Sequence, residues 1–153
     1  MKKLTYIVLL LLPLLCLQCK SSKRSAQASS QRTGVEFVQS ATLSDVLDKA
    51  AAENKLVFVD FYATWCQPCK MMQKDVYPDQ TISSFFNKNF ISYKIDGEKG
   101  NGRNLAALYN VKAYPTLVWL DAKGRVVERK EGAAYHTELM RLAKSALEKN
   151  KLM

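Results

Sequence analysis

The chain has 153 residues, of which 48% are hydrophobic, 24% charged and 10% aromatic, and its formal net charge is +9. This composition excludes a disordered, collagen-like or low-complexity protein and fits one compact domain. Six of the 23 basic residues and none of the 14 acidic ones lie in residues 1–33, so residues 34–153 carry only +3 and give no electrostatic case for binding nucleic acid.

Residues 1–19 predict an export signal or a lipoprotein signal. A positive start precedes an apolar run from Leu4 to Leu17, which suits a signal sequence and is shorter than the roughly 20 residues that cross a bilayer. Residues 20–34 are rich in Ser, Gln and Ala and predict a flexible tether. The sequence therefore predicts an exported protein that meets the membrane only through this segment.

Three outcomes of export stay open. The signal is cleaved after Ala28, or it is kept as an anchor, or Cys19 or Cys16 becomes a lipidated N-terminus. The expected location is therefore the periplasm, either free or as a lipoprotein tethered to the membrane.

Residues 35–153 predict a single α/β domain without internal repeats. Hydrophobic periodicity and capping residues predict helices over 42–54, 67–76, 81–87, 103–109 and 137–149. Strands are predicted over 56–62, 90–95, 116–120 and 126–130, the last two joined by a hairpin turn. The first strand is apolar apart from Asp60, which is typical of a central strand buried on both faces.

The four cysteines form two C-x-x-C pairs, Cys16/Cys19 and Cys66/Cys69. A shared zinc site is disfavoured, because 46 residues separate the pairs and the first pair ends the targeting run. We therefore expect no metal. The alternatives for the second pair are a permanent disulfide, half of a metal site, or a reactive dithiol.

The position of the second pair favours a reactive dithiol. Cys66 stands at the start of a predicted helix, where free backbone N–H groups and the helix dipole stabilise the thiolate. Cys69 is three residues further on and shares its helix face, so the two can form a disulfide. Cys66 can then attack a disulfide of another protein, and Cys69 can resolve the mixed disulfide.

The segment from Val59 to Lys70, which reads Val-Asp-Phe-Tyr-Ala-Thr-Trp-Cys-Gln-Pro-Cys-Lys, resembles the active-site region of the thioredoxin family, and Ala113-Tyr114-Pro115-Thr116 resembles its cis-proline loop. The resemblance covers about residues 36–150. It implies the thioredoxin fold, a central mixed β-sheet flanked by helices, and thiol–disulfide exchange with Cys66 attacking and Cys69 resolving. It also implies a substrate-binding surface formed by Trp65, Gln67, Pro68, Tyr114 and Pro115.

Asp60 has two interpretations. An acid within a strand of Val and Phe is costly to bury in its charged form, and burial would raise its pKa; the alternative is an acid at a strand end that faces solvent. The resemblance implies that Asp60 accepts the proton of Cys69. Ser92 stands where classical thioredoxins have a lysine near this acid, and Lys94 is a candidate to replace it. Lys74 stands where they have a helix-kinking proline, so we expect a straighter helix.

The residues between the two cysteines, Gln67 and Pro68, add no cation and so favour a reducing dithiol. We expect a monomeric protein-disulfide reductase with no cofactor other than its redox-active disulfide. Its expected partners are exported proteins that contain disulfides and a membrane thiol electron donor. A disulfide oxidase or isomerase, and a non-catalytic module that binds through the groove at Tyr114 and Pro115, remain the alternatives.

Overall fold

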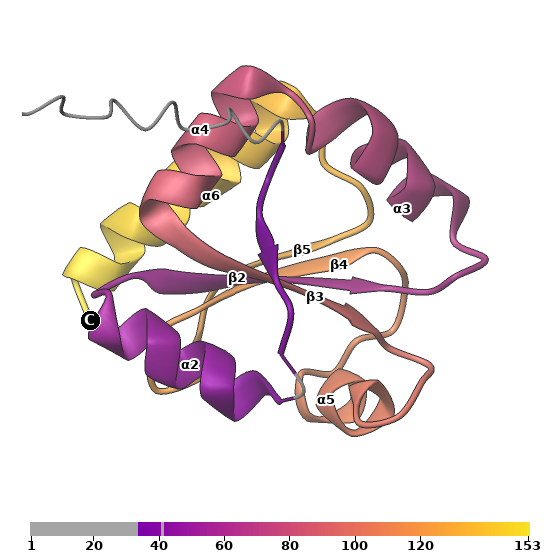
Figure 1. Cartoon of the computed structure of the whole chain (residues 1–153), viewed down its shortest axis with the longest axis horizontal. Helices are drawn as coiled ribbons and strands as arrows, with labels where there is room; N and C mark the ends of the chain where they lie inside the picture. The colour runs from indigo at the N-terminus through magenta and orange to yellow at the C-terminus, as the bar shows by residue number, and fades with distance from the viewer. Residues whose placement is uncertain (1–33, 41) are drawn as a thin grey trace, which may run out of the picture. The chain divides into compact units, whose positions relative to one another are not determined.

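The computed structural model describes residues 34–40 and 42–153. The predicted signal and nearly all of the predicted tether, with the candidate lipidation sites Cys16 and Cys19, lie outside the described residues. The elements run in the order β1 (Phe37–Val38), α2 (Leu43–Ala52), β2 (Leu56–Tyr62), α3 (Gln67–Met71), η1 (Met72–Val76), α4 (Gln80–Asn89), β3 (Phe90–Asp96), α5 (Gly102–Leu108), β4 (Thr116–Leu120), β5 (Val126–Glu131) and α6 (His136–Lys151) (Figure 1).

Every predicted strand and helix is present, with ends that differ from the predicted ones by at most two residues. Strand β1 was not predicted, because two residues are too few to show an alternating pattern. The strands form one mixed sheet in the order β1-β3-β2-β4-β5, in which β1, β3 and β2 are parallel and β4 and β5 are antiparallel to their neighbours. Strand β2 is thus central, as its apolar sequence predicted.

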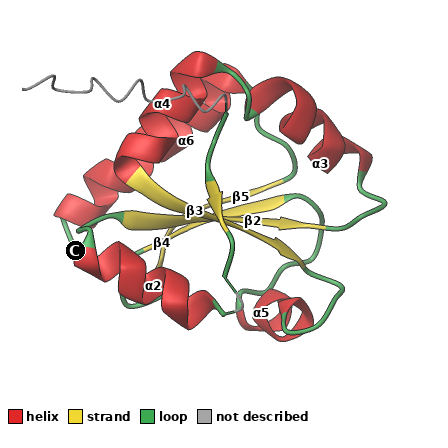
Figure 2. Cartoon of the chain, in the orientation of Figure 1, coloured by secondary structure: helices red, strands yellow, loops and turns green. Residues whose placement is uncertain are grey.

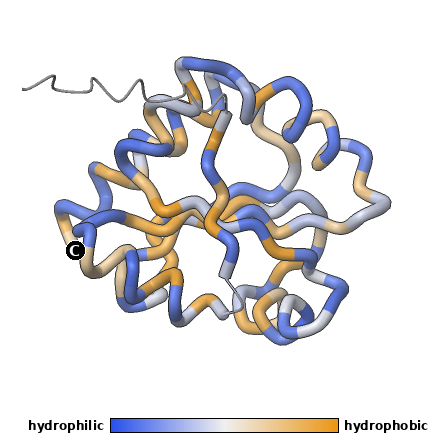
Figure 3. The backbone as a smooth tube through the Cα atoms, viewed as in Figure 1, coloured by the Kyte–Doolittle hydropathy of each residue, from blue (hydrophilic) through white to orange (hydrophobic). Residues whose placement is uncertain are grey.

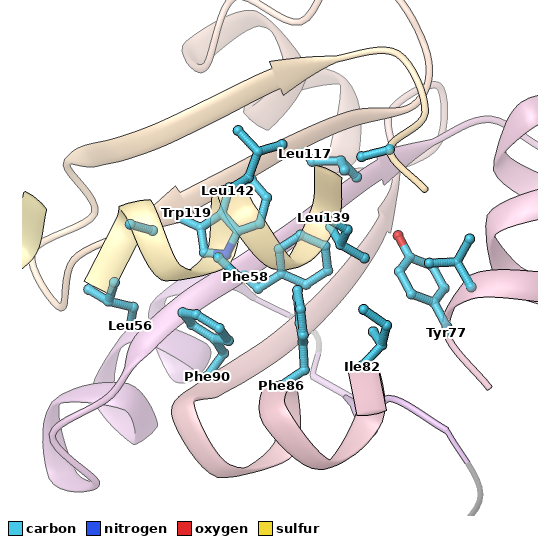
Figure 4. Close-up of a cluster of buried hydrophobic side chains, with 14 of the residues drawn as sticks. Leu56, Phe58, Tyr77, Ile82, Phe86, Phe90, Leu117, Trp119, Leu139 and Leu142 are labelled. Carbon is cyan, nitrogen blue, oxygen red and sulfur yellow. The ribbon is translucent and has the colours of Figure 1, made fainter. Parts of the chain in front are cut away.

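Helices cover both faces of the sheet, with α3, α4 and α6 on one side and α2 and α5 on the other (Figure 2). The central strands are mostly hydrophobic, whereas the helices alternate hydrophobic and hydrophilic residues along the chain (Figure 3). On the α3, α4 and α6 side, Phe58 packs edge-on against Phe86 and lies 5.0 Å from Trp119 between ring centroids (Figure 4). Since side chains alternate along a strand, Asp60 points to the same side as Phe58.

The helix that follows Cys66 changes character halfway. It begins as the α-helix α3 and continues as the π-helix η1, in which the N–H of Tyr77 donates to the carbonyl of Met72, five residues back, at 2.9 Å. The predicted end at Val76 is confirmed, but Lys74 in place of a proline does not make the helix regular. Among residues 34–40 and 42–153, none of the helices is long and apolar enough to span a membrane.

Candidate active site

The cysteine pair lies where β2 gives way to α3. Cys66 is the N-cap of α3 with extended backbone, and its Sγ accepts a hydrogen bond from the N–H of Cys69 at 3.2 Å. Pro68 lies in the first turn, where its missing N–H costs nothing. This is the helix-start position that the sequence predicted, and it places a backbone donor on the sulfur of Cys66 that stabilises a thiolate.

Cys66 and Cys69 are joined by a disulfide, with their Cα atoms 5.4 Å apart, so the structure describes the oxidised state. Both residues are almost fully buried and form a small cluster with Ala63, against which the rings of Tyr62 and Tyr114 pack. Neither cysteine is free to hold a metal in this state, and no group of three or more His, Cys, Asp or Glu in the described part of the chain could hold one.

An exposed aromatic rim stands beside the disulfide. Trp65 is 65% exposed, and its Nε1–H donates to Oε2 of Glu98 at 2.9 Å. Its ring meets that of Tyr114 edge-on at 6.1 Å, and the Tyr114–Pro115 peptide bond is cis, as the resemblance implied. The fold thus brings the exposed Trp65 together with the proline loop, which lies about 50 residues away in the sequence.

Asp60 is buried, with 1% of its surface exposed, so the solvent-facing interpretation is wrong. Its Oδ2 accepts the hydroxyl hydrogen bond of Tyr77 at 3.0 Å and lies 3.4 Å from Nζ of Lys94. Its Oδ1 has no hydrogen-bond partner among the described residues. Burial raises the pKa of Asp60, and the attraction of Lys94 and the hydrogen bond from Tyr77 oppose that rise without cancelling it.

Lys94 is the cation that the sequence proposed in place of Ser92. Parallel pairing sets Lys94 opposite Asp60 in the sheet, while the hydroxyl of Ser92 is buried without a partner among the described residues. Nζ of Lys94 also contacts Oε1 of Gln73 at 3.3 Å and lies 4.8 Å from the ring centroid of Tyr62. Tyr62 in turn packs against the disulfide cluster, so a single side chain separates that cluster from the buried ion pair.

Tyr77, the tyrosine that completes this buried group, was not identified from the sequence. Its hydroxyl has a pKa well above the ordinary value because of burial and the neighbouring Asp60, so it stays protonated and acts as a donor. The segment after η1 carried no signal of this contact beyond the Tyr77-Pro78 pair, which predicted only a break between helices.

Comparison with known proteins finds relatives that are thioredoxins or thiol–disulfide exchange proteins, which agrees with the disulfide at the start of α3. A family model described as a thioredoxin-like domain matches residues 43–146. The thiol:disulfide interchange protein DsbD of Pseudomonas sp. (strain JR1 / K1) is 28% identical over 122 residues, which is 79% of this chain and 21% of that protein. The chloroplastic thioredoxin Y of Oryza sativa subsp. japonica is 34% identical over 130 residues, 82% of this chain and 72% of that one.

A solved structure of a protein proposed to be a disulphide-isomerase from Bacteroides thetaiotaomicron is 40% identical, with a TM-score of 0.68, and the match covers 76% of this chain and 95% of that one. The chain spans about a fifth of the length of the DsbD relative. The sequence match and the structural match agree on a thioredoxin-like oxidoreductase fold with a C-x-x-C disulfide.

Proposed function

Because this chain belongs to the thioredoxin-like family, we propose that it is an exported thiol–disulfide oxidoreductase that reduces protein disulfides through Cys66 and Cys69. The observation that carries the proposal is the disulfide at the start of α3, with a backbone N–H on Sγ of Cys66. Gln67 and Pro68 bring no cation to the helix start, which favours the reducing direction.

The reaction starts from the reduced dithiol. The thiolate of Cys66 attacks one sulfur of a substrate disulfide, which forms a mixed disulfide and releases the first substrate thiolate. Cys69 then gives its proton to Asp60, and its sulfur attacks Sγ of Cys66. The Cys66–Cys69 disulfide forms, the second substrate thiolate leaves, and two electrons have passed from the protein to the substrate.

The surface around the disulfide suits an extended substrate segment. We assign substrate binding to Trp65, Gln67, Pro68, Tyr114 and Pro115. The first three are exposed beside Cys66, Tyr114 packs against the disulfide cluster, and Pro115 follows Tyr114 through the cis peptide bond. The substrates would be exported proteins with disulfides, and a membrane dithiol would return the electrons. The DsbD relative, a thiol:disulfide interchange protein by name, supports the exchange reaction.

Reduction of insulin disulfides tests the activity. Cys66→Ser should abolish turnover, and Cys69→Ser should accumulate a mixed disulfide with its substrate, visible by mass spectrometry. Alkylation of Cys69 before Cys66 at near-neutral pH would overturn the assignment of roles. The reduction potential decides the direction, because a value well above those of thioredoxins would favour the oxidase or isomerase. If the protein with both cysteines intact does not reduce insulin, the alternative of a non-catalytic binding module is favoured.

Export is tested separately on the full chain expressed in a bacterium. The mass of the mature N-terminus distinguishes cleavage after Ala28, lipidation at Cys19 or Cys16, and retention of the signal. Cys19→Ser and Cys16→Ser, compared with each other, identify which cysteine carries a lipid. A protein that stays in the cytoplasm with its first residues intact would refute export.

A further inference from the structure

The π-turn of η1 determines where the side chain of Tyr77 goes. The bond from its N–H to Met72 closes the turn, and the ring then packs edge-on against Phe37 at 5.1 Å and Phe58 at 6.4 Å. Figure 4 shows the ring at one end of the buried cluster. The side chain is 3% exposed, so its hydroxyl has to find a partner inside the protein, and that partner is Asp60.

The two oxygens of Asp60 are in different situations. Oδ2 accepts the hydrogen bond from the hydroxyl of Tyr77 and forms the ion pair with Nζ of Lys94. Oδ1 is equally buried and has no partner among the described residues. A buried carboxylate oxygen without a donor is costly in a structural ion pair, but it is free to receive a proton.

The surroundings of the carboxyl hold few other charges. Lys94 comes from β3 and Tyr77 from the end of η1, whereas β4 places the apolar Leu117 opposite Asp60. Gln73 on η1 is neutral and contacts Lys94. A cavity of about 180 Å³ is lined by Tyr77 and Lys94 but not by Asp60.

We propose that Tyr77 is a positioning residue for the resolving step, which holds Oδ2 of Asp60 together with Lys94 and leaves Oδ1 to accept the proton of Cys69. The inference rests on the proposed function, in which Asp60 is that acceptor. The step balances as written above: the proton moves from the Cys69 thiol to Asp60, the sulfur–sulfur bond to substrate breaks, and the Cys66–Cys69 bond forms. Tyr77 itself keeps its proton throughout.

Tyr77→Phe tests the inference, because it removes the hydroxyl and keeps the ring. In stopped flow with the aryl disulfide DTNB, the first thiolate released reports attack by Cys66 and the second reports resolution by Cys69. In the pH profile of the resolving rate, the acidic limb should move to higher pH in the variant. At a pH on this limb, the variant should therefore resolve the mixed disulfide about tenfold more slowly, the factor expected for one lost hydrogen bond to a charged group. Attack by Cys66 should keep its rate.

Carboxyl carbon NMR of the reduced protein supplies the second measurement, and the pKa of Asp60 should rise in the variant. Tyr109→Phe is the matched control, since it also loses one tyrosine hydroxyl bond, to the carbonyl of Gly124, and should leave both measurements unchanged. Tyr77→3-fluorotyrosine, a stronger donor with the same ring, should move the limb to lower pH and remains informative if Tyr77→Phe folds poorly.

The outcomes separate the two proposals. An unchanged Asp60 pKa in Tyr77→Phe, or a raised pKa with an unmoved limb, would overturn the role of Tyr77. Asp60→Asn serves as the test of the function itself: if it resolves as fast as the wild type, Asp60 is not the acceptor, whatever Tyr77 does to its pKa.

Discussion

Replacing Asp60 with Asn should stabilise the oxidised protein at neutral pH. Burial raises the pKa of this carboxyl despite the nearby Lys94 and the hydrogen bond from Tyr77. A carboxyl with a raised pKa binds its proton more tightly when folded, so its favourable contribution is present at acidic pH and is lost as the pH rises through the folded pKa. The ionised Asp60 is therefore a net cost to the fold at neutral pH.

The expected gain at about pH 8 is about 1–3 kcal/mol, which lies within the range by which uncharged replacements of buried ion pairs stabilise proteins. Asn has nearly the same volume, and its oxygen can still accept from Tyr77. Removing the negative charge should destabilise the Lys94 ammonium group little. The Lys94 side chain is 16% exposed, and its Nζ keeps its hydrogen bond to Gln73 and its cation–π contact with the ring of Tyr62.

Urea unfolding of both proteins from about pH 4 to pH 8 measures the difference. The two should differ least at the acidic end, close to the ordinary pKa of an unfolded aspartate, and should separate as the pH rises through the raised pKa of the folded protein. Asp121→Asn is the control of opposite sign. Burial would raise the pKa of Asp121, but hydrogen bonds from the backbone and side chain of Arg125 and from the N–H of Lys123 lower it overall. That variant should lose stability at neutral pH.

Two results would refute the reasoning on Asp60. A loss of about 3 kcal/mol or more at pH 8 would show a structural ion pair that the fold needs. A difference that does not change with pH would show that the titration of Asp60 is not its cause. The catalytic role predicts the opposite effect on kinetics, since the more stable Asp60→Asn should resolve mixed disulfides more slowly.

Three further changes test other parts of the structure. Gly97→Ala would place a Cβ in a clash with the hydroxyl oxygen of Tyr114 and displace its ring, so kcat/KM for insulin should fall by about tenfold while the rate with DTNB stays unchanged. Phe86→Ala removes a fully buried ring and should cost about 3–5 kcal/mol in urea unfolding. Asp79→Ala removes the oxygen that accepts from the N–H groups of Thr81 and Ile82, and thermal unfolding should show a loss of about 1–2 kcal/mol.

The parts of the fold that the sequence predicted are those specified locally. The long helices repeat their hydrophobic residues at helical spacing, and the central strands β2 and β4 are nearly continuous apolar runs. The position of Cys66 follows from the change from strand to helix around it. The π-turn of η1 has no such signature, because it depends on how the end of the helix packs rather than on spacing. The contact of Tyr77 with Asp60 depends on that turn and was therefore not predictable.

Sheet pairing explains why the cation of Asp60 was predictable even though its usual position is occupied by Ser92. Positions 92 and 94 are two residues apart on β3, so their side chains point to the same face. A lysine at position 94 instead of 92 therefore lies on the same face of the sheet as Asp60, and the register of β2 and β3 places it directly opposite the acid. A cation on this face of β3 can thus reach the buried acid from more than one position, and Lys94 does so one step closer to Tyr62 and the disulfide cluster.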